Sequence, residues 1–133
     1  MKYLLDTHTF LWTVSGSDNI PEQTKLAVIN PDNDVYVSSV SLWEIAIKNR
    51  LGKLDLGDVE TGELIGLSEK MGFELIGLTP TEAITYGNLE ENSHFDPFDR
   101  MLIWQAIGRK LTMVSKDSNF GKFIPHGLKL LWK

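Results

Sequence analysis

The sequence contains no cysteine and no long run of apolar residues. Without cysteine, the chain cannot form a disulfide scaffold, a thiolate zinc site or a cysteine nucleophile. A membrane-spanning helix needs about 18 consecutive apolar residues. The first apolar run, Tyr3 to Leu5, stops at Asp6 and is also too short for the core of a secretory signal. We therefore expect a cytoplasmic protein that does not associate with membranes.

Positive charge is scarce in this chain. Its 13 lysines and arginines face 18 aspartates and glutamates, which gives a formal net charge of -5. This balance argues against a broad basic face that binds nucleic acid through phosphate neutralisation alone. The 133 residues, of which 42% are hydrophobic and 23% charged, predict a single globular domain over residues 1–133.

Several familiar catalytic motifs are also missing. The Gly52-Lys53 pair does not belong to a phosphate-binding P-loop, because residue 47 is Ile and residue 54 is Leu. A nucleophile elbow needs a glycine two residues after its serine, and Ser68 is followed there by Lys70. No two histidines have the four-residue spacing of a helical zinc site; they are His8, His94 and His126.

The pattern of apolar and polar residues predicts strands that alternate with helices. The expected strands span residues 2–6, 34–38, 73–78, 111–115 and 128–132. The expected helices span residues 7–14, 21–30, 40–51, 59–71 and 96–110, and a capping box at residues 79–82 begins another. Apolar residues extend almost all round the helix at 40–51, which predicts that it is largely buried. This order indicates an α/β fold with a mainly parallel sheet covered by helices on both faces.

Four acidic residues fall where such a sheet binds ligands, at the carboxyl ends of its strands. Asp6 ends the first strand, Glu44 lies early in an apolar helix, Asp99 is in the first turn of a helix, and Asp117 follows the strand at 111–115. Four converging carboxylates would repel one another unless their pKa values rise or a divalent cation neutralises them. Oxygen ligands favour Mg²⁺ or Mn²⁺.

Each acid also has a purely structural interpretation. Asp6 suits the N-cap of the helix that follows it, and Asp96, before Pro97, is a better N-cap than a ligand. Glu44 could form a capping box with Ser41 or an ion pair with Lys48. Asp99 could be only an acid that interacts with a helix dipole, and Asp117 could be only a loop residue. Only the joint placement of the acids favours the metal site.

Four segments in this order resemble a known family: LLDTH at 4–8, SLWEIAIK at 41–48, HFDPFDRMLI at 94–103 and SKDSNF at 115–120. The chain resembles PIN-domain ribonucleases, in particular the VapC-like toxins of type II toxin-antitoxin pairs. The resemblance implies a three-layer α/β/α sandwich with a mainly parallel central sheet. It also implies Mg²⁺- or Mn²⁺-dependent endonuclease activity on RNA, dimerisation to a homodimer, and inhibition by a small antitoxin protein.

The resemblance assigns roles to particular residues. The catalytic and metal-binding acids are Asp6, Glu44, Asp99 and Asp117, with Asp96 as a fifth ligand or only a cap. Groups that support them by hydrogen bonds are Thr7, Ser115 and Asn119. Nearby cations that would meet RNA phosphates are Lys48, Arg100, Lys116 and Lys122, each with a solvated surface charge as its alternative. A structural role remains the first interpretation of His8, His94 and the four tryptophans.

Two other functions fit parts of the same pattern. A catalytically silent PIN-like module would bind a partner and cleave nothing. A phosphoacceptor receiver domain also places acids at strand ends, although it usually has an acidic pair after the first strand, where this chain has Asp6 followed by Thr7 and His8. RNA cleavage, metal binding without turnover, and phosphoryl uptake would distinguish the three.

Overall fold

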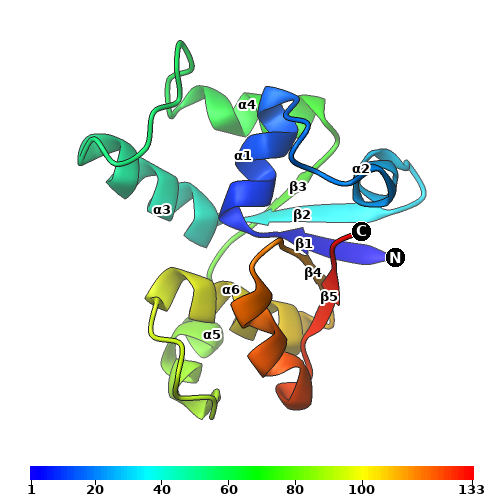
Figure 1. Cartoon of the computed structure of the whole chain (residues 1–133). Coiled ribbons are helices and arrows are strands. Elements are labelled where there is room, and N and C mark those ends of the chain that lie inside the picture. The colour runs from blue at the N-terminus through cyan, green and yellow to red at the C-terminus, as the bar shows by residue number, and fades with distance from the viewer.

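The computed structural model describes residues 1–133 (Figure 1). The strands are β1 (Lys2–Leu5), β2 (Asp34–Ser38), β3 (Glu74–Ile76), β4 (Thr112–Val114) and β5 (Lys129–Leu131). The α-helices are α1 (Thr7–Ser15), α2 (Glu22–Ile29), α3 (Ser39–Arg50), α4 (Glu63–Lys70), α5 (Pro80–Ile84) and α6 (Pro97–Arg109). Two 3₁₀ helices complete the chain, η1 (Tyr86–Asn88) and η2 (Ser118–His126). No helix is long and apolar enough to cross a membrane.

All five strands are parallel, in the order β3-β2-β1-β4-β5. In the middle of the sheet, Leu4 of β1 pairs with Tyr36 of β2 and with Met113 of β4. The order reverses direction between β1 and β4, which is the point where open α/β sheets form a ligand crevice. It also differs from the 2-1-3-4-5 order of receiver domains, so the receiver interpretation is wrong.

The sheet separates two hydrophobic cores, as the predicted three-layer α/β/α sandwich requires. Successive side chains of β1 point to opposite faces: Tyr3 and Leu5 join one core and Leu4 joins the other. The first core receives side chains from α1, α2 and α4, while α6 and η2 cover the opposite face (Figure 1). Helix α3 lies between them, because Val40 packs into one core and Ile45 into the other.

Two of the predicted helix starts are confirmed in detail. Thr79 and Glu82 form the reciprocal capping box at the start of α5, with Pro80 in the first turn. Asp96 caps α6 ahead of Pro97. Both starts use side-chain oxygens to satisfy backbone N–H groups that have no partner within the helix.

One expectation about local structure was wrong, and one helix was not predicted. Helix α3 is not buried all round, because Trp43 is 60% exposed and packs edge-on against Phe98 at the surface. The segment after Asp117 was not predicted to be helical, yet it forms η2, with Phe120 and Phe123 buried three residues apart. That spacing suits the threefold turn of a 3₁₀ helix, but Gly121 and Pro125 inside the segment are more typical of a loop.

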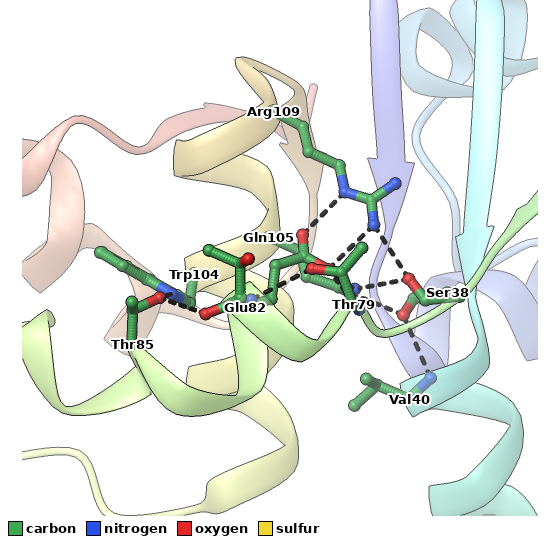
Figure 2. Close-up of polar contacts among 10 residues, drawn as sticks. Ser38, Val40, Thr79, Glu82, Thr85, Trp104, Gln105 and Arg109 are labelled. Atoms are coloured by element: carbon green, nitrogen blue, oxygen red, sulfur yellow. Dashed lines mark hydrogen bonds and ion pairs between the residues drawn. The ribbon is translucent and has the colours of Figure 1, made fainter.

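A partly buried polar network ties α3 to α5 and α6 (Figure 2). The hydroxyl of Ser38, which caps α3, donates to Gln105 Oε1 at 2.6 Å. Gln105 Nε2 donates to the Gly77 carbonyl at 3.2 Å and to Glu82 Oε1 at 3.1 Å. Arg109 closes the network through a 2.8 Å ion pair with Glu82. The network fixes the start of α3 relative to α6, and these two helices carry Glu44 and Asp99.

Candidate active site

Asp6 lies at the point where the strand order reverses. It follows β1 directly, and its Oδ2 accepts a 2.6 Å hydrogen bond from Ser115, the residue after β4. Its Oδ1 accepts from the backbone N–H of Thr9 at 2.8 Å. The predicted N-cap role is therefore confirmed, and it uses one oxygen of a side chain that also faces the neighbouring strand. Burial raises the pKa of Asp6, against the lowering effect of these hydrogen bonds.

Glu44 projects from α3 and is only 2% exposed. The Thr7 hydroxyl donates to Glu44 Oε1 at 2.6 Å, and Lys48 forms an ion pair with Oε2 one turn along the helix. The ion pair confirms one structural interpretation of Glu44. The capping box with Ser41 is wrong, because α3 begins at Ser39 and its cap is Ser38.

Asp96 and Asp99 occupy the first turn of α6. Asp96 Oδ1 accepts from the backbone N–H of Asp99 at 2.9 Å, so its predicted capping role is confirmed. His94 Nε2 lies 3.1 Å from Asp99 Oδ2. Burial raises the pKa of Asp99 to about 6, and the negative charges of Asp96 and Glu44 add to the rise. The rise therefore comes first from burial and then from the neighbouring carboxylates.

Asp117 is the N-cap of η2, just beyond β4. Its Oδ1 accepts from the backbone N–H of Asn119 at 2.9 Å, and its own N–H donates to Ser115 Oγ at 3.1 Å. Ser115 therefore connects Asp6 with Asp117. Asn119 contributes its backbone here and its side chain is exposed, so the orienting role predicted for that side chain remains a prediction.

These elements together surround a cavity of about 470 Å³. All five predicted acids line it: Asp6, Glu44, Asp96, Asp99 and Asp117. The other lining residues are His8, Trp12, Lys48, Lys116, Ser118 and Phe120. Two lysines do not balance five carboxylates, so the cavity carries an excess of negative charge.

The donor set suits a hard divalent cation, since every charged ligand it offers is an oxygen. No three acidic or histidine side chains are yet gathered closely enough to hold an ion. In this arrangement Glu44 is bonded to Thr7 and Lys48, and Asp99 to His94. To hold a cation together with Asp99, the neighbouring carboxylates would have to turn toward it, and Lys48 would have to leave Glu44.

The cations predicted to meet RNA separate into two groups. Lys48 and Lys116 line the cavity, whereas Lys122 is exposed outside it. Arg100 was expected at the surface, and this is wrong: it is 8% exposed and its guanidinium donates to backbone carbonyls, among them that of Leu89 at 2.8 Å. The carbonyls lie in the preceding loop, so Arg100 is a structural residue.

Sequence reasoning missed three contributors to this cavity: Trp12, Ser118 and Phe120. Trp12 shares a wall with His8, their ring centroids lying 6.1 Å apart, and Lys116 Nζ lies 5.8 Å from the Trp12 ring centroid. The position of Trp12 one turn after His8 was a usable signal, because residues four apart share a face of a helix. Ser118 and Phe120 depend on η2, which the pattern did not predict.

Comparison with known proteins agrees with this fold. The model of the PIN domain family matches residues 3–123. The chain belongs to the PIN domain family. This PIN domain also resembles a chain in the crystal structure of VapBC2 from Rickettsia felis bound to a promoter DNA fragment, with a TM-score of 0.70, 20% identity and full coverage of both chains.

Two further solved structures are similar. DNA-bound VapBC from Salmonella typhimurium gives a TM-score of 0.64 at 22% identity, covering 98% of this chain and 97% of that one. FitAcB from Neisseria gonorrhoeae gives 0.62 at 20% identity, covering 97% and 96%. At these identities the likeness establishes the fold of the PIN domain. No curated protein sequence matches it.

Proposed function

We propose that this PIN domain is a metal-dependent endonuclease that hydrolyses phosphodiester bonds of RNA. The observation that carries the proposal is the meeting of Asp6, Glu44, Asp99 and Asp117 in one cavity, from four separate segments of the chain. They lie beside the point where the strand order reverses, which is the expected ligand site of this architecture. The high pKa of Asp99 and of Asp6 supports a site built to bind a cation.

Mg²⁺ or Mn²⁺ would be held by Asp6 and Asp99, directly or through water, with Asp117 completing the set and Asp96 at its edge. When bound, such an ion lowers the pKa of water and neutralises charge that develops on a phosphate. Binding of the ion would also relieve the mutual repulsion of the carboxylates.

The side chains around the cation perform the remaining tasks. Glu44 is the proposed general base, and the Thr7 hydroxyl holds one of its oxygens at 2.6 Å. The other oxygen, once Lys48 has left it, can accept a proton from the attacking water. Lys48 and Lys116 line the cavity and would bind the phosphate backbone. Together with the bound divalent cation, these lysines would supply the attraction for RNA that the overall charge of -5 does not.

We further propose that the nuclease is a cytoplasmic toxin controlled by a small antitoxin, and that it forms a homodimer. The similarity to chains in VapBC and FitAB structures supports the antitoxin. An apolar hollow of about 180 Å³ lined by Trp43, Phe98 and Met101 is a candidate protein-binding surface. Coexpression with the product of an adjacent small reading frame, followed by copurification, tests the antitoxin; light scattering tests the dimer.

The activity is tested by incubating purified protein with RNA in Mg²⁺, in Mn²⁺ and in EDTA. We expect cleavage only with the metals, and its loss in D6N. D32N is the matched control, since Asp32 is an exposed acid that does not line the cavity and makes no ion pair. Equal cleavage by D6N and the unmodified protein would refute the proposal. Mn²⁺ binding without cleavage of any RNA would identify the silent binding module instead.

A further inference from the structure

We propose that His94 is a positioning residue that orients the carboxylate of Asp99, and that Arg100 holds His94 in place. The inference rests on the proposed function, in which Asp99 is a metal ligand. His94 Nε2 lies 3.1 Å from Asp99 Oδ2. An ionised carboxylate has no proton to give, so the ring nitrogen is the donor in this bond. The bond fixes one oxygen of Asp99 and leaves the other available to the cavity.

The imidazole ring is itself fixed by packing. It meets Phe120 and Phe123 edge to face, with centroid distances of 5.9 and 5.8 Å and interplanar angles of 81° and 77°. The His94 side chain is only 11% exposed. Edge-to-face aromatic contacts favour one ring orientation, so His94 presents its Nε2 to Asp99 from a held position and not as a mobile surface group.

Arg100 fixes the backbone on which His94 stands. Its Nη1 donates to the carbonyls of Glu91 and His94, the latter at 2.9 Å, and its Nη2 donates to the Leu89 carbonyl at 2.8 Å. A planar guanidinium presents several donors in a rigid fork. Here that fork binds three carbonyls of a segment, residues 89–94, that has no helix or strand of its own. The segment therefore takes its conformation from Arg100.

The arrangement couples neighbouring residues of α6 through a loop. Asp99 faces the cavity, while the next residue, Arg100, is buried against the loop and near the Phe123 ring, 5.9 Å from its centroid. Hydrogen bonds that orient metal ligands typically change metal affinity or activity by about 10- to 100-fold when they are lost. We expect a loss in this range when the His94 donor is removed.

The test measures Mn²⁺ binding by titration calorimetry, which does not depend on turnover. H94F keeps an aromatic ring against Phe120 and Phe123 but has no donor, and H94L removes both. H94Q places an amide N–H at about the reach of Nε2 and so keeps the donor. H126F is the matched control, because His126 is exposed at the end of η2 and does not line the cavity. Each variant is assayed well below its own melting temperature.

We expect H94F and H94L to bind Mn²⁺ about 10- to 100-fold more weakly, and H94Q and H126F to stay close to the unmodified protein. Equal binding by H94F and the unmodified protein would overturn the inference and leave the proposed nuclease intact. A loss in H94Q as large as in H94F would also overturn it, because a donor at this position would then restore no affinity. Absence of Mn²⁺ binding by the unmodified protein would instead refute the metal-dependent function.

The part assigned to Arg100 is tested by R100K and the double variant R100K/H94F. Lysine cannot bind several carbonyls in the fixed geometry of the fork. We expect R100K to weaken Mn²⁺ binding, and H94F to add little further loss in the double variant, since both changes break the same path to Asp99. Additive losses would show that Arg100 does not act through His94.

Discussion

The network around Gln105 gives a quantitative test of how α3 and α6 are joined. Gln105 is fully buried, and the Ser38 hydroxyl donates to its side-chain oxygen (Figure 2). In Q105L the Ser38 proton loses its acceptor in a dry environment, at a cost of about 1 to 3 kcal/mol. Gly77 and Glu82 keep hydrogen bonds from Arg109, so these two acceptors are not left unpaired.

The partner change S38A strands the Gln105 oxygen, again at about 1 to 3 kcal/mol, and also removes the cap that accepts from Val40 N–H, at about 1 kcal/mol. In S38A/Q105L neither side of the bond is left unpaired. We therefore expect the double variant to be less destabilised than the sum of the single variants, by about 1.5 to 3 kcal/mol.

Urea unfolding of the four proteins, followed by circular dichroism, measures this coupling. The slope of the free energy of unfolding with urea should be unchanged, because the variants expose the same surface on unfolding. Additive losses within about 0.5 kcal/mol would refute the reasoning, and would mean that Ser38 and Gln105 do not depend on each other.

Three further outcomes follow from the structure. Since burial raises the pKa of Asp99 to about 6 and a metal binds the ionised form, Mn²⁺ affinity should fall about tenfold from pH 7 to pH 5. Equal affinities at the two pH values, measured by calorimetry, would contradict this expectation. The ion pair with Arg109 lowers the pKa of Glu82 from 4.5 to about 2, so the stabilisation that Glu82 contributes is complete above pH 4.5 and is lost as the pH falls towards 2. Allowing for its partial exposure, we expect E82Q to reduce the difference in unfolding free energy between pH 7 and pH 2.5 by about 1 to 2 kcal/mol in urea titrations. An unchanged difference would refute the assignment. T7V removes the donor to Glu44 and should lower kcat for RNA cleavage at least about tenfold with little change in KM; a change confined to KM would show that Thr7 contacts substrate.

The fold was predictable because its signals are local. Short apolar strands alternate with capped helices, and the Thr79–Glu82 capping box and the Asp96-Pro97 start are complete within four residues. The gathering of the acids was also predictable, since Asp6 and Asp117 follow strands that meet at one edge of a parallel sheet. A prediction of neighbouring strand ends needs only the strand order and direction.

What could not be predicted depends on contacts between distant segments. Arg100 has the same local sequence whether its side chain is solvated or buried, and only the fold of residues 89–94 supplies the carbonyls that bind it. Several serines near the start of α3 are suitable caps in the sequence. The one that caps the helix, Ser38, also donates a hydrogen bond to Gln105, which is 67 residues away. The partner of His94 at Asp99 likewise depends on that loop.

A crystal of the protein soaked in Mn²⁺ and measured for anomalous scattering tests the central claim most directly, because it locates the ion without reference to activity. We predict a peak inside the 470 Å³ cavity, with carboxylate oxygens of Asp6 and Asp99 as ligands, and its disappearance in D6N. A cavity that contains only water at saturating Mn²⁺, or a peak at some other surface that persists in D6N, would contradict the account.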